Sequence, residues 1–302
     1  MKHCKFSKQI GLIVIFSFIY STSSYSQNWL FGKNCGIEFN KIGSNNYTIS
    51  TIPSNTQTGE GCAVVNDKQG NLLFYCDGAK VYKSNGVVMQ NGTGLFGDPS
   101  SSQATVIIPK PKADTTLCAD SFLVFTTPAW GSGNLCYSLV IFNAANPSGT
   151  VDASHKNIIL ANNASEKLTF YYEPFLDCYW ILAHKIEINN ASNTFGDEYI
   201  ITRLSVGSLA NCLTTTTQKI GSQHQQHYFN APGTMKISPN GKKLATAYWY
   251  ASYVDVFDFN SITGVLSNAQ HLAYPFDAAK PYEYAAYGLS FSANSNYLFS
   301  NC

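Results

Sequence analysis

Short segments of β-branched and aromatic residues recur along most of the chain, separated by clusters of Asn, Gly, Asp and Ser. No long run has apolar residues at i, i+3, i+4 and i+7, so the pattern does not predict amphipathic helices. Branched and aromatic side chains suit the half-buried face of a sheet, and the residues between them suit turns. The pattern predicts an all-β protein, with strands at 62–66, 72–76, 105–109, 121–127, 137–142, 179–185, 198–204, 244–250 and 254–259.

These strands repeat as a unit. Segments 62–75, 235–247 and 289–300 each consist of a strand, a turn with Asn, Asp or Pro before Gly or Ser, and a second strand. The outer half of a unit, again strand, turn and strand, is visible at 254–266, at 139–151 with its turn at Asn146–Gly149, and more loosely at 199–213. The second strands are marked by residues 50, 57, 65 and 53 positions apart: Leu72, Phe122, Tyr179, Leu244 and Tyr297. This period is close to that of propeller blades.

We therefore predict a β-propeller of four-stranded antiparallel blades over 27–302, with an ordinary β-sandwich as the alternative. The propeller is expected to be incomplete, with about four blades plus fragments, because the segment from about residue 285 starts a blade whose outer strands are missing. Segments 29–32 and 36–39 are the strand material expected to complete that last blade, since propellers avoid open edges by closing the ring.

The first 26 residues predict a signal peptide. Lys2, Lys5 and Lys8 precede an apolar run at 10–20, which is too short to span a bilayer, and small residues follow it up to an expected cut between Ser26 and Gln27. The alternative is a cytosolic chain with a chance hydrophobic start. No later segment resembles a membrane span, so the mature chain is expected to be exported.

Composition narrows the classes of partner. Hydrophobic residues make up 45% and charged residues 12% of the 302 positions, which excludes a disordered chain. The formal charge is only +1 and no cluster of Lys or Arg occurs, so a nucleic-acid surface is not expected.

Several motifs resemble, in order, the N-terminal propellers of large exported proteins from bacteria with type IX secretion, a family associated with gliding motility. They are 28–39 (NWLFGKNCGIEF), 60–78 (EGCAVVNDKQGNLLFYCDG), 90–94 (QNGTG), 100–103 with 106–111, and 235–241 (MKISPNG). The resemblance covers most of the mature chain and implies an extracellular or outer cell-surface location in a Gram-negative bacterium. It implies no agreed catalytic activity. Cys76 stands where the family usually has Thr.

Candidate chemistry is sparse. His224 and His227 form the single close His pair, but no third metal ligand is evident nearby, and solvated loop histidines are the alternative. No motif for nucleophilic, phosphate-binding or dinucleotide-binding chemistry occurs, so we expect no catalytic residue, metal or cofactor. Asp255 and Asp258 lie three apart on a strand and should point to opposite faces.

Two further sets of residues are singled out. Eight cysteines follow the signal segment, and Cys62 and Cys76 would lie opposite each other if their hairpin is centred on Gln69. They are disulfide candidates, with free buried thiols as the alternative. Tyr248, Trp249, Tyr250 and Tyr253 belong to an aromatic-rich region that also includes Tyr282, Tyr284 and Tyr287. They could stack on sugar rings if exposed, or pack between blades.

The sequence thus predicts a secreted or cell-surface binding and adhesion module, with loops that contact an extracellular protein or polysaccharide. A polysaccharide-active hydrolase or lyase, and a structural spacer in a large adhesin, are the alternatives. Two or more carboxylates converging in a central funnel would favour the enzyme.

Overall fold

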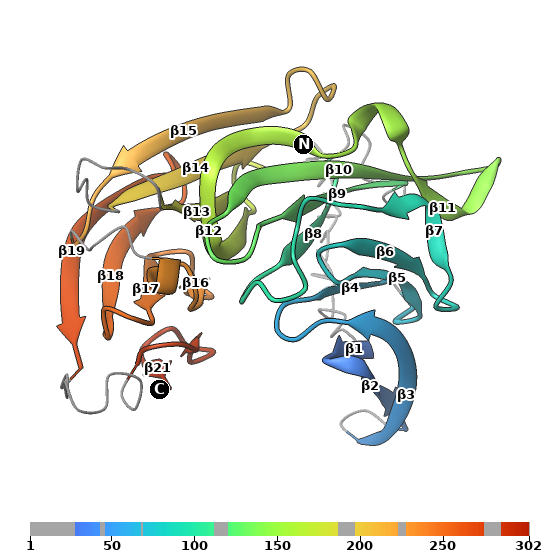
Figure 1. Cartoon of the computed structure of the whole chain (residues 1–302), viewed down its shortest axis with the longest axis horizontal. Coiled ribbons are helices and arrows are strands. Elements are labelled where there is room, and N and C mark those ends of the chain that lie inside the picture. Colours follow the sequence, from blue (N-terminus) through green and yellow to red (C-terminus); the bar gives the residue numbers. More distant parts are fainter. Residues whose placement is uncertain are drawn as a thin grey trace, which may run out of the picture.

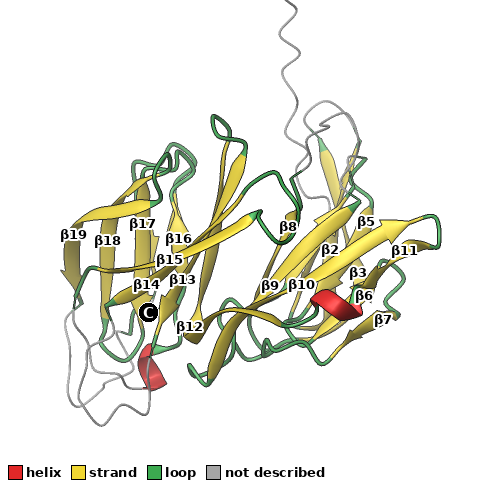
Figure 2. Ribbon diagram, turned by 90° about the horizontal axis from the view of Figure 1, so that it is seen from above, coloured by secondary structure: helices red, strands yellow, loops and turns green. Residues whose placement is uncertain are grey.

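The computed structural model describes residues 28–42, 46–67, 69–111, 120–186, 197–222, 228–274 and 285–301. Its regular elements are strands, apart from two single-turn 3-10 helices, η1 (Ala153–His155) and η2 (Tyr228–Asn230) (Figure 2). The predicted signal segment, with Ser26 and Gln27, lies outside the described residues.

Four antiparallel units of four strands follow one another along the chain, each with its strands in sequence order. Blade 1 contains β4 (Ala63–Asn66), β5 (Leu72–Cys76), β6 (Lys80–Lys83) and β7 (Val88–Thr93). Blade 2 contains β8 (Thr105–Pro109), β9 (Ser121–Thr126), β10 (Gly133–Asn143) and β11 (Asn146–Val151). Blade 3 contains β12 (Ile158–Glu173), β13 (Cys178–Lys185), β14 (Glu198–Leu204) and β15 (Leu213–Lys219). Blade 4 contains β16 (Met235–Ile237), β17 (Lys243–Tyr248), β18 (Tyr253–Asn260) and β19 (Val265–Ala273).

Partial sheets stand at both ends of this series. β1 (Asn28–Phe31), β2 (Lys33–Lys41) and β3 (Tyr47–Gln57) precede blade 1, and β20 (Leu289–Phe291) pairs with β21 (Leu298–Ser300) after blade 4. The units lie along an arc that starts with β1–β3, passes over β8–β15 and ends at β21 (Figure 1). The fold is an all-β propeller with four full blades and two partial sheets, as the repeat predicts.

Blades 1 to 3 are joined into one twelve-stranded sheet. A single parallel bridge, Thr150 to Gln90, links β11 to β7. The long strand β12 belongs to two blades: Ile158–Ala164 pairs with β10 of blade 2, and Leu168–Glu173 pairs with β13 as the first strand of blade 3.

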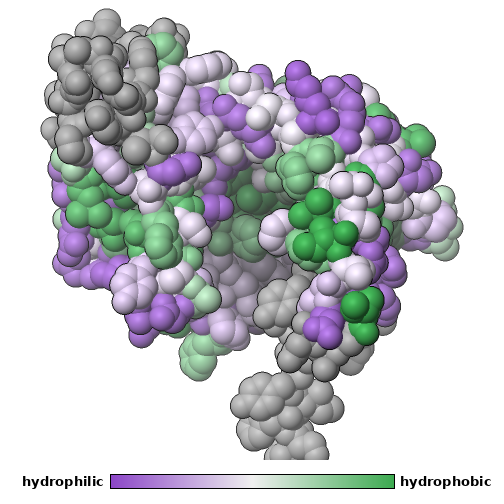
Figure 3. All heavy atoms as spheres, turned by 90° about the horizontal axis from the view of Figure 1, so that it is seen from below, coloured by the Kyte–Doolittle hydropathy of each residue, from purple (hydrophilic) through white to green (hydrophobic). Residues whose placement is uncertain are grey.

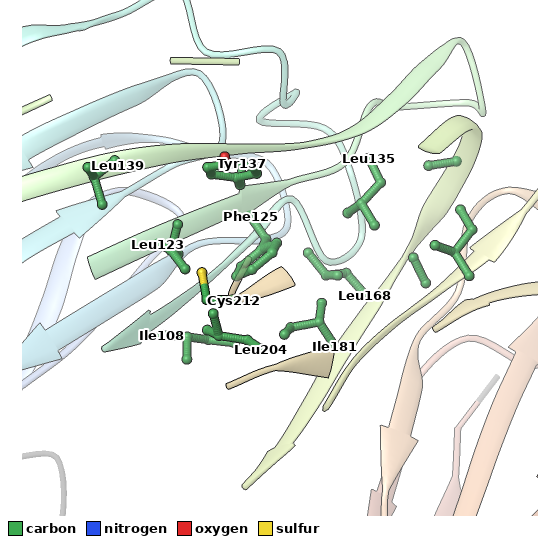
Figure 4. Packing of buried hydrophobic residues seen from close by; sticks show 13 residues of the cluster. Ile108, Leu123, Phe125, Leu135, Tyr137, Leu139, Leu168, Ile181, Leu204 and Cys212 are labelled. Carbon is green, nitrogen blue, oxygen red and sulfur yellow. The ribbon is translucent and has the colours of Figure 1, made fainter. Parts of the chain in front are cut away.

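Apolar layers between neighbouring blades form the core. Alternate residues of β9 face opposite sides, as the two-residue period of a strand requires. Phe122 and Val124 pack with blade 1, whereas Leu123 and Phe125 pack with blade 3 (Figure 4). The same division recurs in β13, where Ile181 faces blade 2 and Leu182 faces blade 4. Each blade is therefore covered on both faces by its neighbours, which an isolated blade could not achieve.

Three local predictions are wrong. Ala63, not Cys62, is opposite Cys76, because the hairpin register shifts between Val65 and Asn66. The outer turn of blade 2 lies before Asn146, and β11 includes Asn146–Val151. Finally, β1 and β2 do not pair with β20 or β21. Within the described chain they join β3 in a separate sheet beside blade 1, where the Asn28 amide donates to Asn66 and Gly70.

Candidate functional site

The first strands of the blades surround a central cavity of about 540 Å³. Its wall comes from β4, β8, β12 and β16, together with the residues just before these strands. We call these four strands and β20 the inner strands. Viewed through the gap in the arc, the molecule is hollowed toward them (Figure 3). Because four separate blades contribute to one wall, residues far apart in the sequence meet there.

Four polar residues join into one hydrogen-bonded group, here called the mouth network: Glu60, Ser102 and Tyr287, each two or three residues before an inner strand, and Glu166 within β12. The Tyr287 hydroxyl donates to Glu60 at 2.7 Å and lies 2.9 Å from the Ser102 hydroxyl. The Ser102 hydroxyl and amide N–H both donate to Glu166 at 2.8 Å. The network therefore links the starts of blades 1, 2 and 3 to the partial sheet after blade 4.

Glu166 is 1% exposed, and both of its carboxylate oxygens accept hydrogen bonds. Oε2 is held by Ser102, and Oε1 accepts from the Trp130 N–H at 2.7 Å. Burial raises the pKa of Glu166, and these hydrogen bonds, together with the Lys167 charge, oppose the shift. A carboxylate so enclosed and occupied acts as a link between blades and cannot reach a ligand.

Lys167 secures blade 4 in the same region. Its side chain is fully buried, and its ammonium donates to three backbone carbonyls, those of Asn230, Ala231 and Pro232, at 2.6, 2.8 and 2.9 Å. Burial lowers the pKa of Lys167 to about 7, and the Glu166 carboxylate opposes this shift. The three carbonyls occupy all three N–H bonds of the charged form.

Gln103 connects three blades. Its side-chain oxygen accepts from the backbone N–H groups of Leu168 and Met235 at 3.1 and 2.7 Å, and its side-chain amide donates to the Met235 carbonyl. Its own backbone N–H donates to the Glu166 carbonyl. One amide side chain thus connects the segment just before β8 of blade 2 to the backbones of β12 and β16.

Two residues of the cavity wall remain open to it. Lys236 is the middle residue of β16, between the buried Met235 and the half-buried Ile237, and it is exposed. Burial in the surrounding protein lowers the pKa of Lys236 and is the sole cause of the shift. Phe170 on β12 is 44% exposed. A cation and an aromatic ring therefore lie on neighbouring strands of one cavity.

The predicted ligand-facing aromatics behave in two ways. Tyr248 and Tyr253 are 1% and 7% exposed, so a role as exposed sugar-stacking rings is wrong for both. Tyr248 lies between blades 3 and 4, with its hydroxyl 2.7 Å from that of Tyr199. Trp249 and Tyr250 are half-buried, and their rings lie 5.5 and 5.9 Å from Phe229. Tyr282 and Tyr284 lie outside the described residues.

The structure favours free thiols over a disulfide for the candidate pair Cys62 and Cys76. Cys62 and Cys76 are both free thiols, as are the other described cysteines. Cys62 Sγ lies 2.9 Å from the Leu30 carbonyl and donates to it. Burial raises the pKa of Cys62 to about 11 and that of Cys76 to about 12, so neither is activated as a nucleophile.

A Ser–His–Asp group was not anticipated. The Ser222 hydroxyl donates to Asp255 at 2.8 Å and lies 2.7 Å from Nδ1 of His271, and the same Nδ1 is 3.2 Å from Asp255. In a catalytic triad the two histidine nitrogens separate the serine from the aspartate. Here one nitrogen faces both, so the group is a structural link.

Asp258 lies on the other face of β18 from Asp255 and pairs with Lys243 at 2.5 Å. This confirms that Asp255 and Asp258 do not form a carboxylate pair.

No metal centre emerges from the described part of the chain, where no group of three His, Cys, Asp or Glu side chains converges. His224 and His227 lie outside the described residues, so the pair remains a prediction. Segments 60–78 and 100–103 contain motifs, but the sequence does not assign the roles that Glu60, Ser102 and Gln103 have in the structure. The signal was their shared position, two or three residues before an inner strand.

No protein-family model matches the sequence, and no curated protein is similar to it. The structure is similar to a putative 6-phosphogluconolactonase from Bacteroides fragilis, with a TM-score of 0.50, 13% identity, and coverage of 90% of this chain and 72% of that one. A putative 6-phosphogluconolactonase from Bacteroides uniformis gives a TM-score of 0.47 at 13% identity, covering 88% and 70%. The Cps50 β-propeller domain of Myceliophteria thermophila gives 0.44 at 11% identity, covering 90% and 77%. At these identities the likeness concerns the fold alone. Among the described residues, no helix has the length and apolarity to cross a bilayer.

Proposed function

We propose that this chain is an exported, non-catalytic binding module of the cell surface that takes up part of a polysaccharide or protein ligand at its central cavity. The observation that carries the proposal is the cavity itself, of about 540 Å³, with a wall built from four blades and an exposed ammonium and an exposed ring within it. Concave sites with a few placed polar groups are the usual form of ligand sites.

The polar groups at the cavity mouth favour a ligand-binding role over a catalytic one. Glu60 accepts from Tyr287 and Glu166 accepts from Ser102, and the two hydroxyls lie 2.9 Å apart, which is the convergence of carboxylates expected of an enzyme. General acid–base catalysis needs both groups within reach of the substrate. Glu166 is buried and fully hydrogen-bonded, so Glu60 alone is exposed to a ligand.

The test is a screen of the purified protein on arrays of neutral and acidic glycans and of surface proteins, followed by titration of each ligand found. Ala63→Trp places a large side chain in the wall of the cavity and reduces its volume. Val265→Trp is the matched control, because Val265 is exposed on the outer strand β19. We expect at least one ligand whose affinity falls about tenfold or more in Ala63→Trp, a loss of ~1.4 kcal/mol, and stays unchanged in Val265→Trp.

Two results would overturn the proposal. Product release from a bound glycan, detected as new reducing ends or unsaturated sugars, would establish the hydrolase or lyase. If no ligand is found, and adhesion stays intact after deletion of the propeller residues 27–302, the chain would be a structural spacer.

A further inference from the structure

Lys236, unlike several other lysines, has no hydrogen-bond or ion-pair partner among the described residues. Lys167 has three carbonyls, Lys185 has Glu198 at 3.1 Å, and Lys243 has Asp258 at 2.5 Å. Among the described residues no acceptor lies within hydrogen-bond distance of the Lys236 ammonium, and no charged group contributes to its pKa shift. The described residues that line the cavity include no Asp or Glu. A cation partly removed from water without compensation is costly, and an anion entering the cavity would supply the missing partner.

Phe170 adds an exposed apolar surface to the wall of the same cavity. It lies on β12, which contacts β16, and its ring is 6.4 Å from that of Tyr179 on the next strand. That contact fixes the ring while 44% of the side chain stays exposed. An aromatic ring of this kind offers a flat face to the C–H groups of a pyranose.

We propose that the cavity binds an acidic saccharide unit, a pyranose that carries a carboxylate, with the carboxylate on Lys236 and one face of the ring on Phe170. This inference rests on the proposed function and names its ligand class. A carboxylate is favoured over a phosphate group because the wall holds one ammonium and no arginine, whereas phosphate sites usually combine several donors.

Isothermal titration at low ionic strength tests it with galacturonate, glucuronate and mannuronate trisaccharides, their neutral counterparts, and inorganic phosphate. We expect at least one uronate to bind, its neutral counterpart to bind about tenfold or more weakly, and phosphate not to bind. Lys236→Met should remove the preference for the acidic sugar, and Lys236→Arg should retain it. Phe170→Ala should weaken the acidic and neutral sugars alike.

Lys242→Met is the matched control, because Lys242 is an exposed lysine of the neighbouring turn, and thermal unfolding checks that every variant folds. Binding unaffected by Lys236→Met, equal binding of neutral sugars, or tighter binding of phosphate would each overturn the inference. If no uronate binds but another ligand is blocked by Ala63→Trp, the inference fails while the proposed function stands.

Discussion

Lys167 and Lys236 lie on neighbouring inner strands and have opposite surroundings. The first is enclosed by protein and donates to three carbonyls, and the second faces the cavity without a partner. A buried charge is tolerated when its hydrogen bonds are complete, and removing it then leaves the acceptors unpaired. The same substitution at the two positions should therefore have opposite effects.

Lys167→Met should lower the free energy of unfolding by about 3–5 kcal/mol, because three buried carbonyls lose their donor.

Lys236→Met should raise the thermal midpoint at neutral pH. Since burial depresses the folded-state pKa of Lys236 below its ordinary 10.5, its charge destabilises the fold at low pH, and this cost fades as pH rises toward 10.5. Thermal unfolding of both variants across this range checks the signs. A gain in Lys236→Met that grows with pH would contradict the assignment.

Little of this residue-scale detail was predictable. Lys167 is 63 positions from the first carbonyl that it meets, and no local pattern signals such a contact. The aromatic-rich region was visible in the sequence, but composition cannot distinguish a ring packed between blades from one exposed on a loop. The buried Tyr248 and the half-buried Trp249 are sequence neighbours.

Short turns connect the first two strands of blade 1, of blade 4 and of the partial sheet after blade 4, and these turns share one backbone feature. Gly70, Gly241 and Ser295 occupy equivalent turn positions with φ values of 88°, 68° and 63°. Glycine adopts this left-handed region freely, whereas a residue with a side chain is strained there. A side chain at Gly241 would also overlap the ring of Tyr171 in blade 3.

Reciprocal substitutions test this comparison. Ser295→Gly should raise the free energy of unfolding by up to about 1 kcal/mol, through relief of backbone strain. Gly241→Ser should lower it by about 1–3 kcal/mol or more, because strain and overlap act together. Denaturant titrations with unchanged slopes provide the measurement. Equal losses in both variants would mean that the two turns are not equivalent.

Gln103 provides a second test at the level of elements. Gln103→Leu leaves the backbone N–H groups of Leu168 and Met235 without their acceptor, at a cost of about 1–3 kcal/mol each. Hydrogen exchange should accelerate at these two amides before it does elsewhere. Gln270→Leu, on the exposed face of β19, is the control. Unchanged protection at both amides would show that the side chain does not join the strands.

Strand positions were largely predictable, whereas pairing registers were not. Alternation and turn residues placed β5, β8 and β14 at their observed bounds. The register of the first hairpin depends on a one-residue irregularity after Val65, and this displaced Cys62 from Cys76. The repeat predicts that a central cavity exists, but it does not predict the residues that line it. The lining depends on which side chain of each inner strand faces the centre.

The whole molecule is held by layers between blades, and several of these layers enclose phenols. Tyr199 and Tyr248 meet between blades 3 and 4, and Tyr253 lies close by. Burial is the main cause that raises the pKa of all three above the ordinary 10.0. Above pH 10.0, these tyrosines therefore stay protonated in the folded protein, whereas they lose their phenolic protons in the unfolded chain.

This difference predicts unfolding at alkaline pH. With raised folded-state pKa values, the phenols favour the folded state fully below pH 10.0, and this contribution is lost as pH rises beyond that value. Phenolate absorbance should show a late class of tyrosines that ionises together with loss of the β-sheet circular dichroism signal. A single early titration with the fold intact would contradict the enclosure of these rings.

The continuity of β12 has a mechanical consequence. Its first half is hydrogen-bonded to blade 2 and its second half to blade 3, so one stretch of covalent backbone carries load between the two sheets without a flexible joint. In the cell-surface role proposed above, the module would experience shear. Tension that enters blade 2 or blade 3 would be transmitted directly to the other, so the two blades would resist force and unfold together. Blades would separate first at junctions where a loop connects them.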